Sequence, residues 1–266
     1  MTDTLALATT IRRHALRMVH RAKASHIGSA LSIADIVAVL YGGAMHVDPA
    51  RPRAPERDRF ILSKGHACVA VYAALAARGF FPEDDLLRYG QDHSELMNHI
   101  SHKVPGVEFS TGSLGHGLPF GVGKALAAKR RGQPWRTFVV LSDGEWGEGS
   151  NWEACMFASH HELDNLVAVI DYNKLQSLTT VAETLALEPL ADKLAAFGWA
   201  VREVDGHDHA ALSDAFATAP WTRGKPSVVI AHTTKGKGVS YMENTVKWHY
   251  STPNDAQLAQ ALSELE

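Results

Sequence analysis

Short runs of consecutive apolar residues alternate with segments of helical periodicity along most of the chain. Strands are predicted from these runs at 60–63, 137–141, 166–170, 200–204 and 227–231. Helices are predicted between them at 67–78, 152–161, 190–197 and 210–217. Nearly continuous apolar strands are typical of a parallel sheet that is buried on both faces. The pattern therefore predicts an α/β fold whose parallel sheet is covered by helices on both faces.

The first segment has the spacing of an amphipathic helix, with apolar residues at alternating three- and four-residue steps from Ala8 to Ala22. We expect this helix to stop near Gly28 and a second one to follow from about Ser32. The sequence contains no internal repeat and no low-complexity linker. We therefore expect one domain over residues 1–266, with a peripheral C-terminal helix within 251–266.

Polar residues follow two of the predicted strands at the point where each strand ends. The run Ser142-Asp143-Gly144-Glu145 follows the second strand, and Asp171-Tyr172-Asn173-Lys174-Leu175 follows the third. A single predicted helix separates them, and such right-handed crossovers most often place their two strands side by side. We therefore expect Asp143 and Asn173 to lie close together, at the sheet edge where ligands bind in α/β proteins.

A carboxylate, an amide oxygen and a loop carbonyl are suited to a hard cation, with phosphate oxygens and water completing its shell. Mg²⁺ is the expected ion, with Ca²⁺ or Mn²⁺ as alternatives. Gly144 would allow a phosphate to approach the backbone, and a helix beginning near Ser150 would favour its negative charge. The alternative is purely structural: Asp143 caps a turn and Asn173 tolerates a left-handed conformation.

Composition excludes several classes of protein. Hydrophobic residues make up 45% of the chain and charged residues 21%, which excludes a disordered or collagen-like chain. The net charge of −3 gives no positive field for binding a nucleic acid. The only cysteines, Cys68 and Cys155, cannot form a disulfide framework, and no signal peptide or membrane span is recognised. We expect a cytoplasmic location.

The spacing of 30 residues between Asp143-Gly144 and Asn173 resembles the motif of thiamine-diphosphate enzymes. Other segments resemble the amino-terminal domain of transketolases, in the same order, over roughly residues 10–250. The resemblance is carried by Ala24-Ser25-His26-Ile27-Gly28, Leu62-Ser63-Lys64-Gly65-His66-Ala67, the glycine-rich segment Pro105–Gly115 and Lys247-Trp248-His249. His99 stands six residues before Pro105, as it does in the family.

This resemblance implies roles for particular residues. It implies that the metal is bound by Asp143, Asn173 and the backbone oxygen of Leu175. It implies cofactor contacts from His66, Gly112, Ser113, Leu114, Gly144, Glu145 and His249, together with the metal ligands. Two further histidines, His26 and His99, would face the substrate's hydroxyl groups. Glu148 matches a glutamate that in the family lies at the subunit contact near the cofactor's pyrimidine ring, and it joins the catalytic candidates.

The 15 histidines divide into two groups. A structural role is expected for those outside any motif, namely His14, His20, His46, His207 and His209. His160 and His161 lie at the expected end of a helix, where positive charge is favourable. His26, His66, His99 and His249 lie in loops on the expected ligand side, and imidazoles there can exchange protons with sugar hydroxyls near neutral pH. These four are the catalytic histidine candidates.

Three positions differ from the common family pattern. Ser142 replaces a glycine, His116 stands where many relatives have glutamine, and Tyr250 follows His249 where glycine is usual. These differences leave the substrate open more than the cofactor.

The resemblance also implies a partner chain. In the family the cofactor is activated by a glutamate on a second domain, which has no counterpart in this sequence. We therefore expect a separate C-terminal transketolase subunit with a pyrimidine-binding domain, in an α2β2 assembly.

The leading hypothesis is transfer of a two-carbon ketol unit from a ketose, expected to be phosphorylated, to an aldose. One alternative is a carboligase or synthase subunit of the 1-deoxyxylulose-5-phosphate synthase type. Another is a non-catalytic structural partner subunit. A magnesium-dependent phosphohydrolase is the fourth, although only Glu145 offers that chemistry a second nearby acid.

Overall fold

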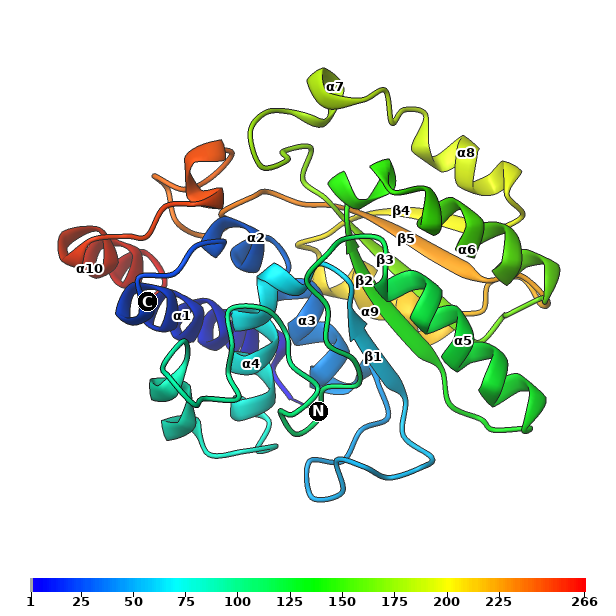
Figure 1. Cartoon of the computed structure of the whole chain (residues 1–266), viewed down its shortest axis with the longest axis horizontal. Coiled ribbons are helices and arrows are strands. Elements are labelled where there is room, and N and C mark those ends of the chain that lie inside the picture. Colours follow the sequence, from blue (N-terminus) through cyan, green and yellow to red (C-terminus); the bar gives the residue numbers. More distant parts are fainter. Residues whose placement is uncertain (1) are drawn as a thin grey trace.

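A parallel β-sheet forms the centre of the molecule (Figure 1). The computed structural model describes residues 2–266. The five strands found there are β1 (Arg59–Leu62), β2 (Thr137–Ser142), β3 (Leu166–Tyr172), β4 (Ala200–Asp205) and β5 (Ser227–His232). Their order across the sheet is β1-β2-β3-β5-β4, and every neighbouring pair is parallel. The prediction of a parallel sheet, with its second and third strands side by side, is confirmed.

Helices cover both faces of this sheet (Figure 1). On one side lie α1 (Thr4–Ala22), α2 (Ile27–Ser32), α3 (Ala34–Val39), α4 (Cys68–Ala77), α9 (His209–Thr218) and α10 (Asp255–Glu264). On the other lie α5 (Gly117–Arg130), α6 (Gly149–His160), α7 (Val181–Thr184) and α8 (Leu190–Ala196). No helix in residues 2–266 combines the length and apolar composition needed to cross a membrane.

The strands are apolar throughout because both of their faces are buried. Successive side chains of a strand point to opposite faces. In β2, Phe138 and Val140 enter the core with α1, α3 and α4, whereas Val139 and Leu141 enter the core with α5 and α6. All four side chains are fully buried. The edge strand β4 is only partly covered, which explains its mixed apolar and polar sequence.

Short helical turns join the main elements. They are the π-helical turn η1 (Leu40–Ala44) and the 3-10 turns η2 (Gly65–Ala67), η3 (Glu83–Arg88), η4 (Gly144–Gly147) and η5 (Val246–His249). Three of them, η2, η4 and η5, directly follow or contain the motifs that the sequence marks as chemical.

The predicted boundaries of the first two helices are wrong. The helix α1 ends at Ala22, where Lys23 adopts the left-handed conformation and bonds back to the last turn. The next helix, α2, begins at Ile27 after His26, which also has a positive φ of 72°. Apolar spacing continues across this turn, so periodicity alone could not reveal the break.

Two other boundaries affect the candidate site. The strand β3 extends to Tyr172, so Asp171 is a fully buried strand residue and not part of a loop. The helix α6 begins at Gly149, after the turn η4. At the C-terminus, α10 packs along α1 with Ala261 fully buried, and it lies within the segment expected to form a peripheral helix.

Candidate functional site

A cavity of about 240 Å³ lies at the carboxyl ends of β2 and β3. Its wall is formed by Ser29, Lys64, His66, Leu114, Ser142, Asp143, Gly144, Asn173, Leu175, Gln176, Ser177, Lys235, His249 and Tyr250. These residues come from loops that are far apart in the sequence, and the parallel sheet brings them to one edge.

Asp143 and Asn173 lie on the wall of this same cavity. The Asp143 carboxylate is only 2% exposed, and its Oδ2 accepts a hydrogen bond of 2.7 Å from the backbone N–H of Lys174. Burial, followed by the negative charge of Asp171, raises the pKa of Asp143 to about 7. A cation bound here would offset both effects.

Neighbouring groups fix the orientation of Asn173. Its Nδ2 donates to Asp171 Oδ2 at 3.0 Å, and its Oδ1 accepts from the backbone N–H of Leu175 at 3.1 Å. The backbone oxygen of Leu175 accepts from Lys235 Nζ at 2.9 Å. An ammonium group therefore already lies against the oxygen that the sequence-based hypothesis gives to a metal.

The available donors fit a hard cation held together with a diphosphate. Carboxylate, amide and carbonyl oxygens are the ligands that Mg²⁺ and Ca²⁺ prefer. The hydroxyl of Ser142 is buried on the cavity wall and has no hydrogen-bond partner within the described chain, so it can bond to a phosphate oxygen. Residues 2–266 contain no cluster of three or more His, Cys, Asp or Glu side chains suited to a metal. A cation here would therefore need further oxygens from a bound molecule.

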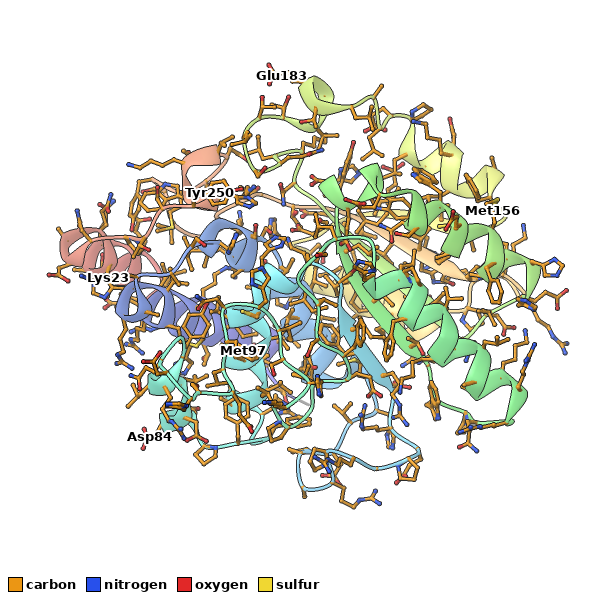
Figure 2. All side chains as sticks on the ribbon, viewed as in Figure 1. Lys23, Asp84, Met97, Met156, Glu183 and Tyr250 are labelled. Carbon is orange, nitrogen blue, oxygen red and sulfur yellow. The ribbon has the colours of Figure 1, made fainter. Side chains whose placement is uncertain are left out.

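The four histidine candidates form one cluster beside the cavity. The ring of His26 lies 5.1 Å from those of His66 and His249 and 5.8 Å from that of His99, measured between centroids. The backbone N–H of His26 also donates to the backbone oxygen of His249 at 2.7 Å. Tyr250 follows His249 and lies near α2 with an exposed ring (Figure 2).

Burial is the main cause of a lowered pKa in all four histidines. It lowers the pKa of His26 to about 4 and that of His249 to about 3, and the pKa values of His66 and His99 also fall. Nearby positive groups add to this effect, with Lys235 the second cause at His249. The imidazoles are therefore neutral at physiological pH, and each can both donate and accept a hydrogen bond.

Three buried charges under the cavity were not identified as site residues from the sequence. Lys64 and Asp171 form an ion pair, with side chains 1% and 0% exposed. Lys235 is equally buried, and burial followed by the charge of Lys64 lowers its pKa to about 8. Lys64 lies within a segment that carries the family resemblance, which was the one signal for it. Asp171 and Lys235 gave none, because a buried charge is recognisable only from its surroundings.

The other predicted residues are less close to the cavity. Leu114 and Gly144 line it, whereas Gly112 and Ser113 are exposed on the neighbouring loop. Glu148 is exposed at the start of α6.

The Glu145 carboxylate is directed away from the cavity and bonds to other loops. No residue of α6 lines the cavity, so the expectation that this helix faces a phosphate is not supported.

The structural interpretation of the remaining histidines agrees with their contacts. His207 and His209 both bond to the buried carboxylate of Asp35, at 2.6 and 3.0 Å. Arg12 bonds to the same carboxylate from α1. This network fastens α1 and α3 to the loop that follows β4.

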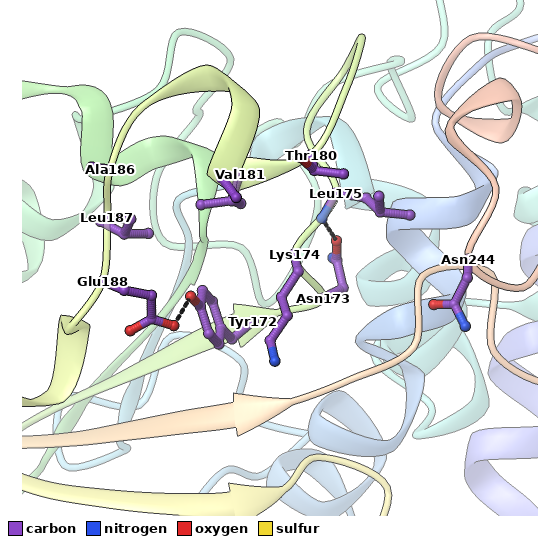
Figure 3. A pocket seen from close by; sticks show the side chains of 11 residues that line it. Tyr172, Asn173, Lys174, Leu175, Thr180, Val181, Ala186, Leu187, Glu188 and Asn244 are labelled. Atoms are coloured by element: carbon purple, nitrogen blue, oxygen red, sulfur yellow. Dashed lines mark hydrogen bonds between the residues drawn. The ribbon is translucent and has the colours of Figure 1, made fainter.

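A larger cavity of about 680 Å³ adjoins the first (Figure 3). The two share Asn173 and Leu175, but the larger one contains none of the four histidines. Its wall is mostly apolar, and the hydroxyl of Tyr172 donates to Glu188 there. The smaller cavity holds the charged and titratable groups, so we assign the candidate site to it.

Comparisons with known proteins agree with this assignment. The sequence profile described as "Transketolase, thiamine diphosphate binding domain" matches residues 4–265. One of the two subunits of an apulose-4-phosphate transketolase from Phocaeicola vulgatus is 44% identical over 254 residues, which covers 96% of this chain and 90% of that protein. A 6-deoxy-6-sulfo-D-fructose transketolase subunit of a Clostridium species is 40% identical, covering 97% and 94%.

Solved structures give the same result. Transketolase from Leishmania mexicana matches with a TM-score of 0.93 and 32% identity, and transketolase from Campylobacter jejuni with 0.93 and 30%. Both matches cover all of this chain but only 41% and 43% of those longer proteins. The chain belongs to the transketolase family, in which it corresponds to the thiamine-diphosphate-binding domain.

Proposed function

We propose that this chain is the N-terminal subunit of a split, cytoplasmic transketolase. It transfers a two-carbon ketol unit from a phosphorylated ketose to an aldose, and acts only with a C-terminal subunit that carries the pyrimidine-binding domain, in an α2β2 assembly. The observation that carries the proposal is the meeting of Asp143, Asn173 and Leu175 with the histidine cluster at one cavity. The names of the two subunit relatives support it.

In this proposal the cavity wall binds thiamine diphosphate through a divalent cation, with Mg²⁺ preferred over Ca²⁺ or Mn²⁺. Oxygens of Asp143, Asn173 and Leu175 would bind the cation. Around the diphosphate lie the Ser142 hydroxyl, Gly144, His66, His249 and Lys235. Gly112, Ser113 and Leu114 would border the cofactor from their loop. When bound, the cofactor supplies a nucleophilic carbon that attacks the ketose carbonyl.

The histidines would handle the substrate's protons. His26 and His99 would contact the substrate's hydroxyl groups, and their neutral rings can accept a proton and return it. His66 and His249 would connect this region to the diphosphate. Glu148 is exposed where a partner chain could reach it, as the catalytic hypothesis for this residue requires.

Replacement of Asp143 by asparagine tests the proposal. We expect Mg²⁺-dependent binding of thiamine diphosphate to the assembled pair to weaken by more than about a hundredfold, because changes even outside the inner ligand shell cost about 10–100-fold. Isothermal titration calorimetry measures this affinity. Asp205→Asn is the matched control, because Asp205 also ends a strand but is exposed and does not line the cavity. Unchanged binding in the Asp143 variant, or no Mg²⁺-dependent binding by the wild type, would contradict the proposal.

The donor substrate separates this reaction from that of a synthase. With the assembled pair, a phosphorylated ketose should be consumed when an aldose acceptor is present, and pyruvate should not. Turnover of pyruvate alone would favour the 1-deoxyxylulose-5-phosphate synthase type, and binding without turnover of either would favour a structural subunit.

A further inference from the structure

Glu145 has a fully buried side chain whose carboxylate connects three separate segments. Its Oε1 accepts from the Ser63 hydroxyl and, at 3.1 Å, from the backbone N–H of Gly115. Its Oε2 accepts from the backbone N–H of Ser142 at 3.0 Å. The side chain is 0% exposed and does not line the cavity.

Each of these three segments carries residues of the cavity wall. Ser63 directly follows the first strand and precedes Lys64 and His66. The two others are adjacent to wall residues, since Leu114 precedes Gly115 and Asp143 follows Ser142. The Ser63 hydroxyl also accepts from the N–H of Gly117 at 3.1 Å, which fastens the start of α5 to the same point.

Backbones in this region are packed closely. A Cβ atom on Gly117 would lie 2.3 Å from the Ser63 hydroxyl oxygen, and one on Gly65 would lie 2.3 Å from the backbone oxygen of Thr111. Contacts this close leave no room for independent movement of the loops. A shift of the Glu145 carboxylate would therefore be passed on to His66, Leu114 and Asp143.

Only a carboxylate fits the three donors. Both of its oxygens accept hydrogen bonds and neither donates. A glutamine has the same shape, but its NH2 group would face either the N–H of Ser142 or the N–H of Gly115. One buried N–H group would then lose its acceptor, and such a loss is costly.

We propose that Glu145 is a positioning residue, which holds the three loops in the register that binds the cofactor without touching the cofactor itself. This inference rests on the proposed function, and it replaces the direct contact expected from the sequence. It predicts that the carboxylate controls cofactor affinity more than the chemical step.

The test compares Glu145→Gln with Asp58→Asn. Asp58 is a matched control because it is 4% exposed and likewise accepts from two backbone N–H groups, those of His46 and Arg136, and from one side chain, that of Arg136. Arg136 immediately precedes β2, so Asp58 performs this role at the opposite, amino end of the sheet.

For the assembled pair, we expect Glu145→Gln to raise the Kd for thiamine diphosphate at saturating Mg²⁺ by about tenfold or more. The kcat at saturating cofactor should stay within about threefold of the wild type. Asp58→Asn should leave both quantities unchanged, even if it lowers the melting temperature equally. Equal affinity in wild type and Glu145→Gln, or equal losses in both variants, would overturn the proposal.

Hydrogen exchange of the chain separates this inference from the proposed function. Peptides covering 62–68, 112–118 and 140–147 should exchange faster in Glu145→Gln and not in Asp58→Asn, whether or not thiamine diphosphate is the ligand. If Glu145→Gln does not fold, Ser63→Ala removes one of the three donors and should give the same pattern with smaller amplitude. Unchanged exchange in these peptides would overturn the positioning role.

Discussion

At the residue scale, the site combines a neutral histidine cluster with a few buried charges. The rings of His26, His66 and His249 lie within 6 Å of one another, so charging more than one would be costly. Lys64 and Lys235 contribute positive charge beneath them, and Asp171 pairs with Lys64. Positive charge is thereby kept near the expected diphosphate, while the rings remain able to exchange protons.

The neutral state of these rings predicts a loss of stability in acid. Burial lowers the pKa of folded His26 from 6.5 to about 4. Between these values the unfolded chain binds more protons than the native chain, so the free energy of unfolding falls as the pH falls from 6.5 towards 4. His26→Asn, which tolerates the left-handed backbone there, should show a smaller drop in melting temperature between about pH 7.5 and pH 5.5 than the wild type.

Thermal unfolding followed by circular dichroism at the two pH values measures this difference. His160→Asn, at an exposed position of α6, serves as the control. An acid-induced drop of the same size in the wild type and in the His26 variant would contradict the expected cost of burying this ring.

At the scale of elements, the fit of α5 against the sheet depends on a glycine. A Cβ atom on Gly121 would lie 2.5 Å from Val139 Cγ2 of β2. Further along the same helix, Gly123 is exposed and has no atom within 4 Å of such a Cβ. The two positions therefore separate the effect of close packing from that of helix propensity.

Gly121→Ala should destabilise the chain by about 1–3 kcal/mol, because overpacking outweighs the gain in helix propensity. Gly123→Ala should stabilise it by up to about 1 kcal/mol, since only the propensity changes. Urea unfolding measures both values. A change of the same sign and size at the two positions would show that the contact with β2 does not limit the residue at 121.

At the scale of the whole molecule, large apolar side chains are exposed around the mouth of the cavity. Leu178 is 80% exposed and directly follows Ser177 of the cavity wall. Tyr250 is 59% exposed, and its ring centroid lies 4.7 Å from that of His249. Because these side chains adjoin the site, we expect the proposed C-terminal subunit to cover them.

Leu178→Ser should therefore weaken association with that subunit by about fivefold or more, the size of effect seen for a moderately important interface residue. The stability of the chain by itself should change little, since the side chain is exposed. Leu5→Ser, at a 65% exposed position in the first turn of α1, is the matched control. Sedimentation of the mixed subunits measures association, and equal effects of the two substitutions would exclude a specific contact at Leu178.

The sequence predicted the fold well because its signals are local. Burial on both faces makes each central strand continuously apolar, and this alone identified β2, β3 and β5. The ends of elements were less predictable, because they depend on single residues such as Lys23 and His26 in left-handed conformations. The end of β3 was missed because Asp171, although charged, is buried as part of the strand through its contact with Lys64.

The sequence by itself determined the alternation of strands and helices, the polar residues at two strand ends and the family to which they point. These properties follow from residue order, since adjacent residues and regular spacings act over short distances. Only the tertiary structure decided that Glu145 faces the loops, that Lys235 reaches the Leu175 carbonyl and that four histidines from four segments share one cluster. Such contacts depend on how distant segments pack together and on which charges that packing removes from water.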